Sequence, residues 1–154
     1  MPQRKISSLD ELKGLIGQEV AVGDWLEIDQ PRIDAFAEVT LDRQWIHVDP
    51  TRAKSESPYG ATIAHGFLTL SLLSHLLFAA IHVDAGFTRG INYGINRLRF
   101  PSAVTCGSRI RGHFLLQSVK DVEGGIELVW AITIDVEGQS KPAAVVEWVL
   151  RQYR

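Results

Sequence analysis

The longest apolar stretch of the chain runs from His65 to about Ile81. It contains no Asp, Glu, Lys or Arg and is apolar nearly all round. A helix with that pattern must be buried on every side or must span a membrane. The interleaved Ser, Thr and His residues, and the absence of basic residues immediately before the stretch, speak against a membrane span. We therefore predict a buried helix over residues 65–81.

The residues that follow this stretch are patterned like β-strands. From Ile126 to Val136, apolar and polar side chains alternate, as expected of a strand with one buried face. Glycine-containing turn signals at residues 123–125 and 137–139 separate this segment from its neighbours and are typical of hairpins. We predict four strands here, over Ile91–Phe100, Arg109–Val119, Ile126–Val136 and Ala143–Tyr153.

Shorter elements are predicted before the apolar stretch. A short strand is expected over Val20–Ile28. Asp29 can serve as an N-cap and Pro31 lies in the first turn after it, so a helix should begin there and fade around Thr40. Residues 41–64 show no sustained period and contain proline turn signals, which predicts a loop with room for one turn of helix.

A curved antiparallel sheet wrapped around one long apolar helix buries that helix economically. The predicted fold class is therefore α+β, in the arrangement known as the hot-dog fold. The 154 residues contain no repeat, low-complexity tract or long linker, so residues 1–154 are expected to form a single domain. Such a sheet leaves its edge strands open and its helix partly uncovered. Edge-to-edge pairing with a second subunit would resolve both, and we expect a homodimer.

Charge and composition exclude several classes of function. The formal net charge of -2 argues against a protein that wraps nucleic acid or coats an anionic membrane. Residues 1–5 carry charge but no apolar segment follows them, so no secretory signal is predicted and a cytoplasmic location is expected. Cys106 is the only cysteine and has no neighbouring base in sequence. We interpret it as a small, at least partly buried residue in a reducing compartment.

Asp42 and His47 form the first constellation with chemical potential. They are five residues apart, where the predicted helix gives way to a loop, so their side chains can converge on one point. A carboxylate and an imidazole together can hold a water molecule and move protons at neutral pH. Spacing alone favours a simpler interpretation, in which His47 is a loop residue that bonds a backbone carbonyl.

Gly66 belongs to a second constellation, at the start of the apolar helix. It falls in the first turn, where backbone N–H groups have no partner within the helix. A glycine there lets a ligand approach these groups closely, and the helix dipole favours negative charge, which together suit an oxyanion hole. A glycine needed only for tight packing explains the residue comparably well. The neighbouring His65 is expected to brace the loop by hydrogen bonding rather than to act directly.

These two segments resemble a known family. Residues 36–53, which contain Asp-x4-His-x-Asp-Pro, and the run Ile63-Ala64-His65-Gly66-Phe67 are similar to the hydratase-2 signature of the MaoC-like dehydratases. The likeness continues through residues 91–101 and covers most of the chain. It most resembles the subgroup of nodulation protein N-like proteins and mycobacterial (R)-specific enoyl-CoA hydratases. Gln44-Trp45 stands where many members carry Asn-Pro, which we interpret as altered substrate preference.

The resemblance implies an (R)-specific enoyl thioester hydratase, which adds water to trans-2-enoyl thioesters or, in reverse, dehydrates 3-hydroxyacyl thioesters. Asp42 and His47 would be the catalytic pair, with the roles of acid and base between them open. The backbone N–H of Gly66 would bind the thioester oxygen as negative charge develops on it. Coenzyme A or acyl carrier protein would carry the substrate. No other cofactor, no nucleic acid and no membrane partner is implied.

Further residues are assigned to the surroundings of the substrate. Arg97 and Arg99 are near enough to Arg89 in sequence to form a basic patch for a carrier phosphate, although a solvated strand face explains at least one of the three. Tyr93 and Asn96 are expected to line the acyl tunnel. The whole substrate-binding set is His65, Tyr93, Asn96, Arg97 and Arg99. No metal is expected, because three further histidines lack an acidic partner at metal-site spacing: His75, His82 and His113.

Two other functions stay open at this point. A hot-dog acyl thioesterase would use the same scaffold, but it gives no reason for Asp42 and His47 beside Ala-His-Gly. A catalytically silent acyl-thioester-binding protein would not need an intact set of Asp42, His47 and Gly66, although fold and motif do not by themselves prove turnover.

Overall fold

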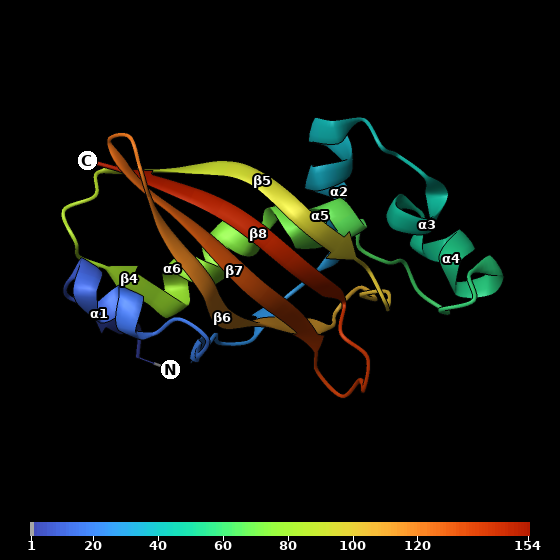
Figure 1. Cartoon of the computed structure of the whole chain (residues 1–154). Helices are drawn as coiled ribbons and strands as arrows, with labels where there is room; N and C mark the ends of the chain where they lie inside the picture. The colour runs from blue at the N-terminus through green and yellow to red at the C-terminus, as the bar shows by residue number, and fades with distance from the viewer. Residues whose placement is uncertain (1) are drawn as a thin grey trace.

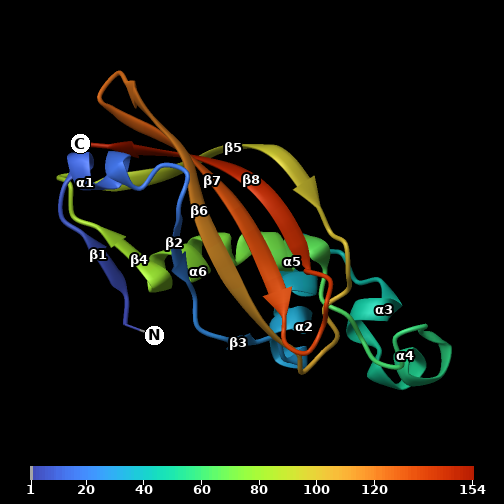
Figure 2. The same ribbon diagram turned by 60° about the horizontal axis from the view of Figure 1, so that its bottom comes forward.

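In the computed structural model, which describes residues 2–154, a curved antiparallel sheet wraps around a central helix (Figure 1, Figure 2). The strand order is β2-β6-β7-β8-β5, with β3 paired beside β6. Hairpins join β6 to β7 and β7 to β8, at the two predicted turns. This is the predicted α+β hot-dog arrangement. Its strands are β2 (Glu19–Val22), β3 (Leu26–Glu27), β5 (Arg89–Arg99), β6 (Arg109–Val122), β7 (Gly125–Val136) and β8 (Ala144–Tyr153).

The inner face of the sheet carries the hydrophobic core. Along β7 every second residue from Ile126 to Val136 is buried, which confirms the predicted alternation. Trp130 and its register partner Trp148 lie on this face, and Leu73 and Leu77 of the central helix are equally buried. Successive side chains of a strand point to opposite faces, so the residues between these positions face away from the helix.

The central helix is interrupted once. The sequence predicts a single helix over residues 65–81, whereas the structure has α5 (Gly66–Ser71) followed by α6 (Leu73–Ala80). The hydroxyl of Ser71 donates to the carbonyl oxygen of Phe67 at 2.7 Å, and such bonding to the preceding turn weakens the helical ladder and often bends a helix. The prediction of one unbroken helix is wrong in this respect. Among the described residues, no helix is both long and apolar enough to cross a membrane.

The helix predicted after Asp29 is confirmed. In α2 (Gln30–Thr40), the Asp29 side chain accepts a hydrogen bond from the backbone N–H of Arg32, and Pro31 lies in the first turn. Asp29 is therefore the N-cap that the sequence predicts. The strand predicted just before it is present as two short strands, β2 and β3, rather than as one.

The segment predicted as a loop contains two short helices, α3 (Trp45–Val48) and α4 (Pro50–Glu56). The Asp49 side chain accepts from the backbone N–H of Arg52 at 2.9 Å, and Pro50 occupies the first helical position. An N-cap followed by proline starts a helix. The interpretation of Asp49-Pro50 as a loop signal is therefore wrong.

Three elements at the far end of the central helix are not anticipated by the sequence. β1 (Arg4–Ile6) pairs in parallel with β4 (Ile81–Val83), and α1 (Leu9–Gly14) lies beside them (Figure 1). Ile6 and Leu12 are fully buried and close this end of the core. The helices α2, α3 and α4 gather at the opposite end, where α5 begins (Figure 1).

Gly125 constrains the hairpin between β6 and β7. A Cβ atom on this residue would lie 1.9 Å from the backbone oxygen of Gln152, far inside any contact distance. Gly125→Ala is therefore expected to lower the free energy of unfolding by about 1–3 kcal/mol, the usual cost of overpacking, in chemical denaturation. Gly14→Ala is the control, because a Cβ there meets nothing within 4 Å. Equal effects of the two substitutions would contradict the expectation.

Candidate active site

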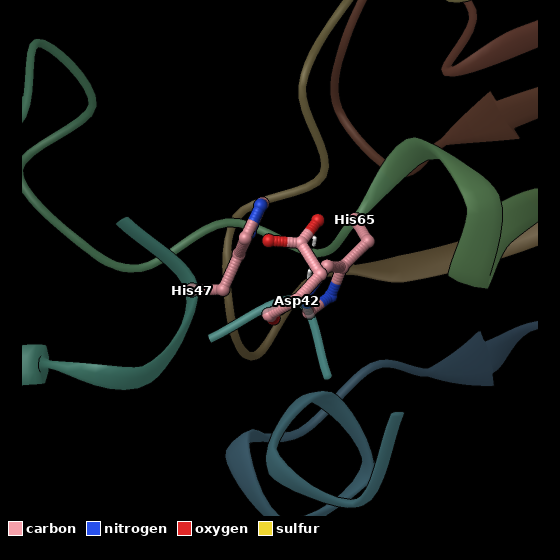
Figure 3. Close-up of side chains that lie close together, drawn as sticks. All are labelled: Asp42, His47 and His65. Carbon is pink, nitrogen blue, oxygen red and sulfur yellow. Dashed lines mark hydrogen bonds and ion pairs between the residues drawn. The ribbon is translucent and has the colours of Figure 1, made fainter. Parts of the chain in front are cut away.

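Asp42 reaches the site because α2 ends abruptly at Thr40, two residues before it. Leu41 adopts the left-handed region, with φ of 62°, although it is not a glycine. This conformation stops the helix and costs a leucine on the order of 1 kcal/mol. Strained backbone beside polar side chains is typical of a functional position. The turn brings Asp42 to His47 and His65, as Figure 3 shows.

His47 is fixed through its ring. The side chain lies in α3 and is buried, and its Nδ1 is 2.6 Å from the carbonyl oxygen of Ile63. Because a carbonyl only accepts, Nδ1 carries the proton and the neutral ring presents Nε2 as an acceptor. Burial lowers the pKa of His47 from its ordinary 6.5. The nearby His65 lowers that pKa further, against the opposing effects of the Ile63 carbonyl and the Asp42 carboxylate. His47 is therefore neutral at pH 7.

His65 holds the other two residues together. Its ring stacks on the ring of His47, with 3.7 Å between centroids and 23° between planes, and contacts Phe36 at a centroid distance of 5.0 Å. Its Nε2 donates to the backbone carbonyl of Asp42 at 2.9 Å and lies 4.0 Å from the Asp42 carboxylate. These are the contacts that a bracing residue would make, and the bracing role of His65 stays a prediction.

A buried polar bridge that the sequence did not reveal supports the arrangement. The amide of Gln30 donates to the backbone carbonyl of His47 at 2.7 Å, and its Oε1 accepts from the hydroxyl of Thr62 at 2.5 Å. Thr62 is 2% exposed, so its hydroxyl depends on this protein partner. Gln30 thereby ties α2 to α3 and to the segment before α5. The one signal in the sequence is the position of Thr62, two residues before the Ala-His-Gly run.

Gly66 is the first residue of α5 and directly follows His65. Its N–H therefore has no acceptor within the helix. It borders a hollow of about 560 Å³ that Tyr59 and Thr69 also line. A Cβ atom on Gly66 would meet the Phe100 ring at 3.0 Å. Both explanations of this glycine, close packing and access to the amide, are thus compatible with its surroundings.

The donor atoms of Asp42, His47 and His65 lie within 4.8 Å of one another, which is close enough for the three side chains to be considered as metal ligands. Each imidazole uses one nitrogen on a backbone carbonyl and keeps a lone pair on the other, as metal-binding histidines do. The stacked rings, however, direct these remaining lone pairs along nearly parallel planes. A metal at about 2 Å from one nitrogen, in the plane of that ring, would lie out of the plane of the other. The geometry suits proton transfer better than metal binding.

Tyr93 and Asn96 do not reach this cluster within one chain. Trp148 faces the core, so its neighbour Glu147 and, further along β8, Arg151 face outward. Asn96 donates to Glu147 at 2.7 Å, and the Arg151 guanidinium lies 3.5 Å from the centroid of the Tyr93 ring. Both side chains therefore lie on the outer face of the sheet. The placement of these two residues in a tunnel between helix and sheet is not supported within one chain.

The three arginines of the predicted patch separate into two places. Arg97 and Arg99 border a hollow of about 380 Å³ together with Glu147 of β8. Arg89, at the other end of β5, lies over the Tyr153 ring at 5.6 Å. Ten residues of strand separate Arg89 from Arg99, or roughly 33 Å. A phosphate patch could involve Arg97 and Arg99 but not all three.

The sheet wrapped around α5 and α6 defines a hot-dog protein, with a polar cluster at the start of the helix. The chain belongs to the family of the MaoC like domain, whose model matches residues 11–137. Membership of this family supports a hydratase or dehydratase activity.

Two curated relatives and one solved structure illustrate the likeness. The chain is 44% identical to nodulation protein N of Rhizobium meliloti over 143 residues, covering 92% of this chain and 89% of that protein. It is 43% identical over 149 residues to 3-hydroxyacyl-thioester dehydratase Z of Mycobacterium tuberculosis, covering 96% and 97%. The structure of an (R)-hydratase from A. caviae, described as involved in PHA biosynthesis, matches with a TM-score of 0.66 at 22% identity, covering 88% and 94%.

Proposed function

We propose that this protein is an (R)-specific enoyl thioester hydratase, which adds water to trans-2-enoyl groups carried by coenzyme A or acyl carrier protein and dehydrates 3-hydroxyacyl thioesters in reverse. The observation that carries the proposal is the meeting of the Asp42 carboxylate with neutral His47 and with His65, the residue directly before the first amide of α5. Two acceptors of this kind can hold one water molecule and take its proton. The (R) configuration and the thioester rest on the family likeness.

The proposed reaction needs three groups of the chain. The substrate carbonyl oxygen accepts a hydrogen bond from Gly66 N–H. Asp42 and His47 hold the water, and one of them takes its proton as the water oxygen bonds to the β-carbon. The electron pair of the carbon–carbon double bond moves toward the thioester oxygen, where Gly66 N–H stabilises the enolate-like charge. A proton is then delivered to the α-carbon, which completes the addition of water.

We further propose that the protein is cytoplasmic, forms a homodimer, and needs no cofactor beyond the carrier of its substrate. β5 is an edge strand on which all residues except Leu98 are exposed. Ile91, Tyr93 and Ile95 are 49%, 57% and 40% exposed, and an unprotected apolar edge invites pairing with another copy. Sedimentation equilibrium tests this, and a monomer at micromolar concentration would contradict it.

Crotonyl-CoA distinguishes the proposed activity from its alternatives. We expect loss of the conjugated enoyl absorbance without release of free thiol, and a chiral separation should show (R)-3-hydroxybutyryl-CoA. Thiol release would instead indicate a thioesterase. Binding of the substrate without either change would indicate a silent thioester-binding protein.

The pH dependence of the reaction should report His47. Because burial lowers the pKa of His47 below 6.5, the acidic limb of kcat/KM, where the ring becomes protonated, should be centred below pH 6.5. Titration of the imidazole signals by NMR should assign the same transition to His47 in the free enzyme. An acidic limb centred above pH 6.5 would contradict the expectation.

A further inference from the structure

A second cavity, of about 190 Å³, lies at the end of α6 far from Asp42 and His47. Residues of α6, β4, β7 and β8 line it, and two of them, Phe78 and His82, are exposed. Leu77 is 11 residues beyond Gly66, which places the cavity roughly 16 Å along the helix from the proposed active site. Its lining residues are Leu77, Phe78, Ile81, His82, Val83, Leu128, Trp130, Leu150 and Gln152.

Two buried polar atoms belong to this lining, which is partly polar and partly apolar. The indole of Trp130 is 1% exposed, and no group of the described chain accepts a hydrogen bond from its Nε1–H. The side-chain Oε1 of Gln152 is also buried, and no described donor reaches it. Buried polar atoms are rarely left without a partner, because their desolvation is then uncompensated.

Gln152 also departs from the pattern of its strand. The inner-facing positions of β8 are Ala144, Val146, Trp148 and Leu150, and Gln152 is the next in that alternation. Its register partner is the buried Ile126 of β7. A polar side chain in a row of apolar ones does not serve core packing, and it lies where it can act on a ligand in the cavity.

We propose that this cavity binds a hydroxyl group carried on a short apolar chain. The hydroxyl oxygen accepts from Trp130 Nε1–H, and its proton is donated to Gln152 Oε1. A hydroxyl is the small group that accepts and donates at the same time, so it satisfies both atoms. The carbon chain contacts Leu77, Leu128 and Leu150. The volume of about 190 Å³ is large enough for a hydroxyl group and a short carbon chain.

Two sources can supply this hydroxyl group. A separate alcohol is one. The other, which rests on the proposed function, is the remote end of the substrate's acyl chain. A further hollow of about 280 Å³ lies between helix and sheet nearer Gly66, lined by Leu70, Ser74 and Trp148 among others. The two hollows follow one another along α5, α6 and β8, and in this second case the acyl chain would run from the first toward the second.

Binding is tested without catalysis. The four tryptophans give four indole N–H signals in a ¹H–¹⁵N NMR spectrum, and Trp130→Phe identifies that of Trp130. Titration with hexan-1-ol should shift the Trp130 signal in a saturable way. Gln152→Leu should weaken the affinity about tenfold, the effect of losing one buried hydrogen bond. Gln117→Leu, an exposed strand residue outside the cavity, is the matched control and should leave the affinity unchanged.

Enzyme kinetics then shows whether the hydroxyl group belongs to a separate alcohol or to the acyl chain of the substrate. Enoyl-CoA substrates of increasing length, with and without a terminal hydroxyl, are compared by kcat/KM. A preference of about tenfold for the hydroxylated substrate at one length, lost in Gln152→Leu, assigns the cavity to the acyl chain. Hexan-1-ol binding without such a preference assigns it to a separate alcohol. Binding without turnover of either substrate overturns the proposed function and leaves the cavity assignment standing. Failure of hexan-1-ol to shift the Trp130 signal, or equal affinity in Gln152→Leu, overturns the proposal.

Discussion

Asp42→Asn is expected to lower kcat for the hydration of crotonyl-CoA about 10²–10⁴-fold, with the protein still folded. The amide cannot take a proton from water and presents a donor where the carboxylate presents only acceptors. Folding should be retained because the bond from His65 goes to the backbone carbonyl of Asp42, and the Asp42 side chain is 56% exposed. Initial rates give kcat, and thermal denaturation monitors folding.

Asp121→Asn is the matched control for this prediction. The Asp121 side chain is 73% exposed and pairs with Lys13 at 3.3 Å, an exposed ion pair of little energetic weight. Its replacement should leave kcat unchanged. Ordinary activity in Asp42→Asn would show that the chemistry occurs elsewhere, whatever the control does.

The strands and hairpins could be predicted because their signals are local. The alternation from Ile126 to Val136 has the period of a strand, and both flanking turns place a glycine with positive φ, Gly124 and Gly138, between strands. The break in the central helix could not be predicted in this way. The apolar pattern continues on both sides of the break, and the hydroxyl of Ser71, which bonds to the Phe67 carbonyl beside it, is no reliable sign of a break in a sequence.

The sequence also did not reveal which face of the sheet each residue of β5 occupies. The pairing of β5 with β8 shifts register twice, between Asn92 and Gly94 and again between Ile95 and Arg97. Tyr93 and Asn96, both assigned to the acyl tunnel from the sequence, are the extra residues at these two irregularities. A bulge changes which face the following residues occupy, and the one sequence signal for it, Gly94 within the strand, does not fix the residue at which the register shifts.

The candidate site could be predicted only in part, because some of its contacts join segments that are far apart in the sequence. Asp42 and His47 could be paired because they are close in sequence and because the Ala-His-Gly run resembles a known motif. Gln30 and Thr62 are 32 residues apart, and their bond exists only once α2, α3 and the segment before α5 have assembled. The stacking of His65 on His47 is likewise a product of that assembly.

Gly66→Pro is expected to lower kcat about 10²–10³-fold, the usual effect of removing one oxyanion donor. Proline has no N–H, yet its fixed φ suits the first position of a helix, which Gly66 occupies. His65 already has φ of -59° and ψ of 138°, the extended conformation that a residue before proline requires. The substitution therefore removes the proposed donor while the start of α5 can form. Steady-state kinetics with crotonyl-CoA measures the effect.

Gly66→Ala separates this loss from crowding. An alanine Cβ would meet the Phe100 ring carbons at 3.0–3.1 Å, so the ring must shift by a few tenths of an ångström, but the backbone N–H remains. We expect Gly66→Ala to retain most of its kcat, and circular dichroism and thermal melting should show both variants folded. Equal loss of kcat in the two would mean that Gly66 is needed for packing against Phe100. A loss confined to Gly66→Pro would mean that its amide acts on the substrate, because crowding affects both variants and only proline lacks the proton.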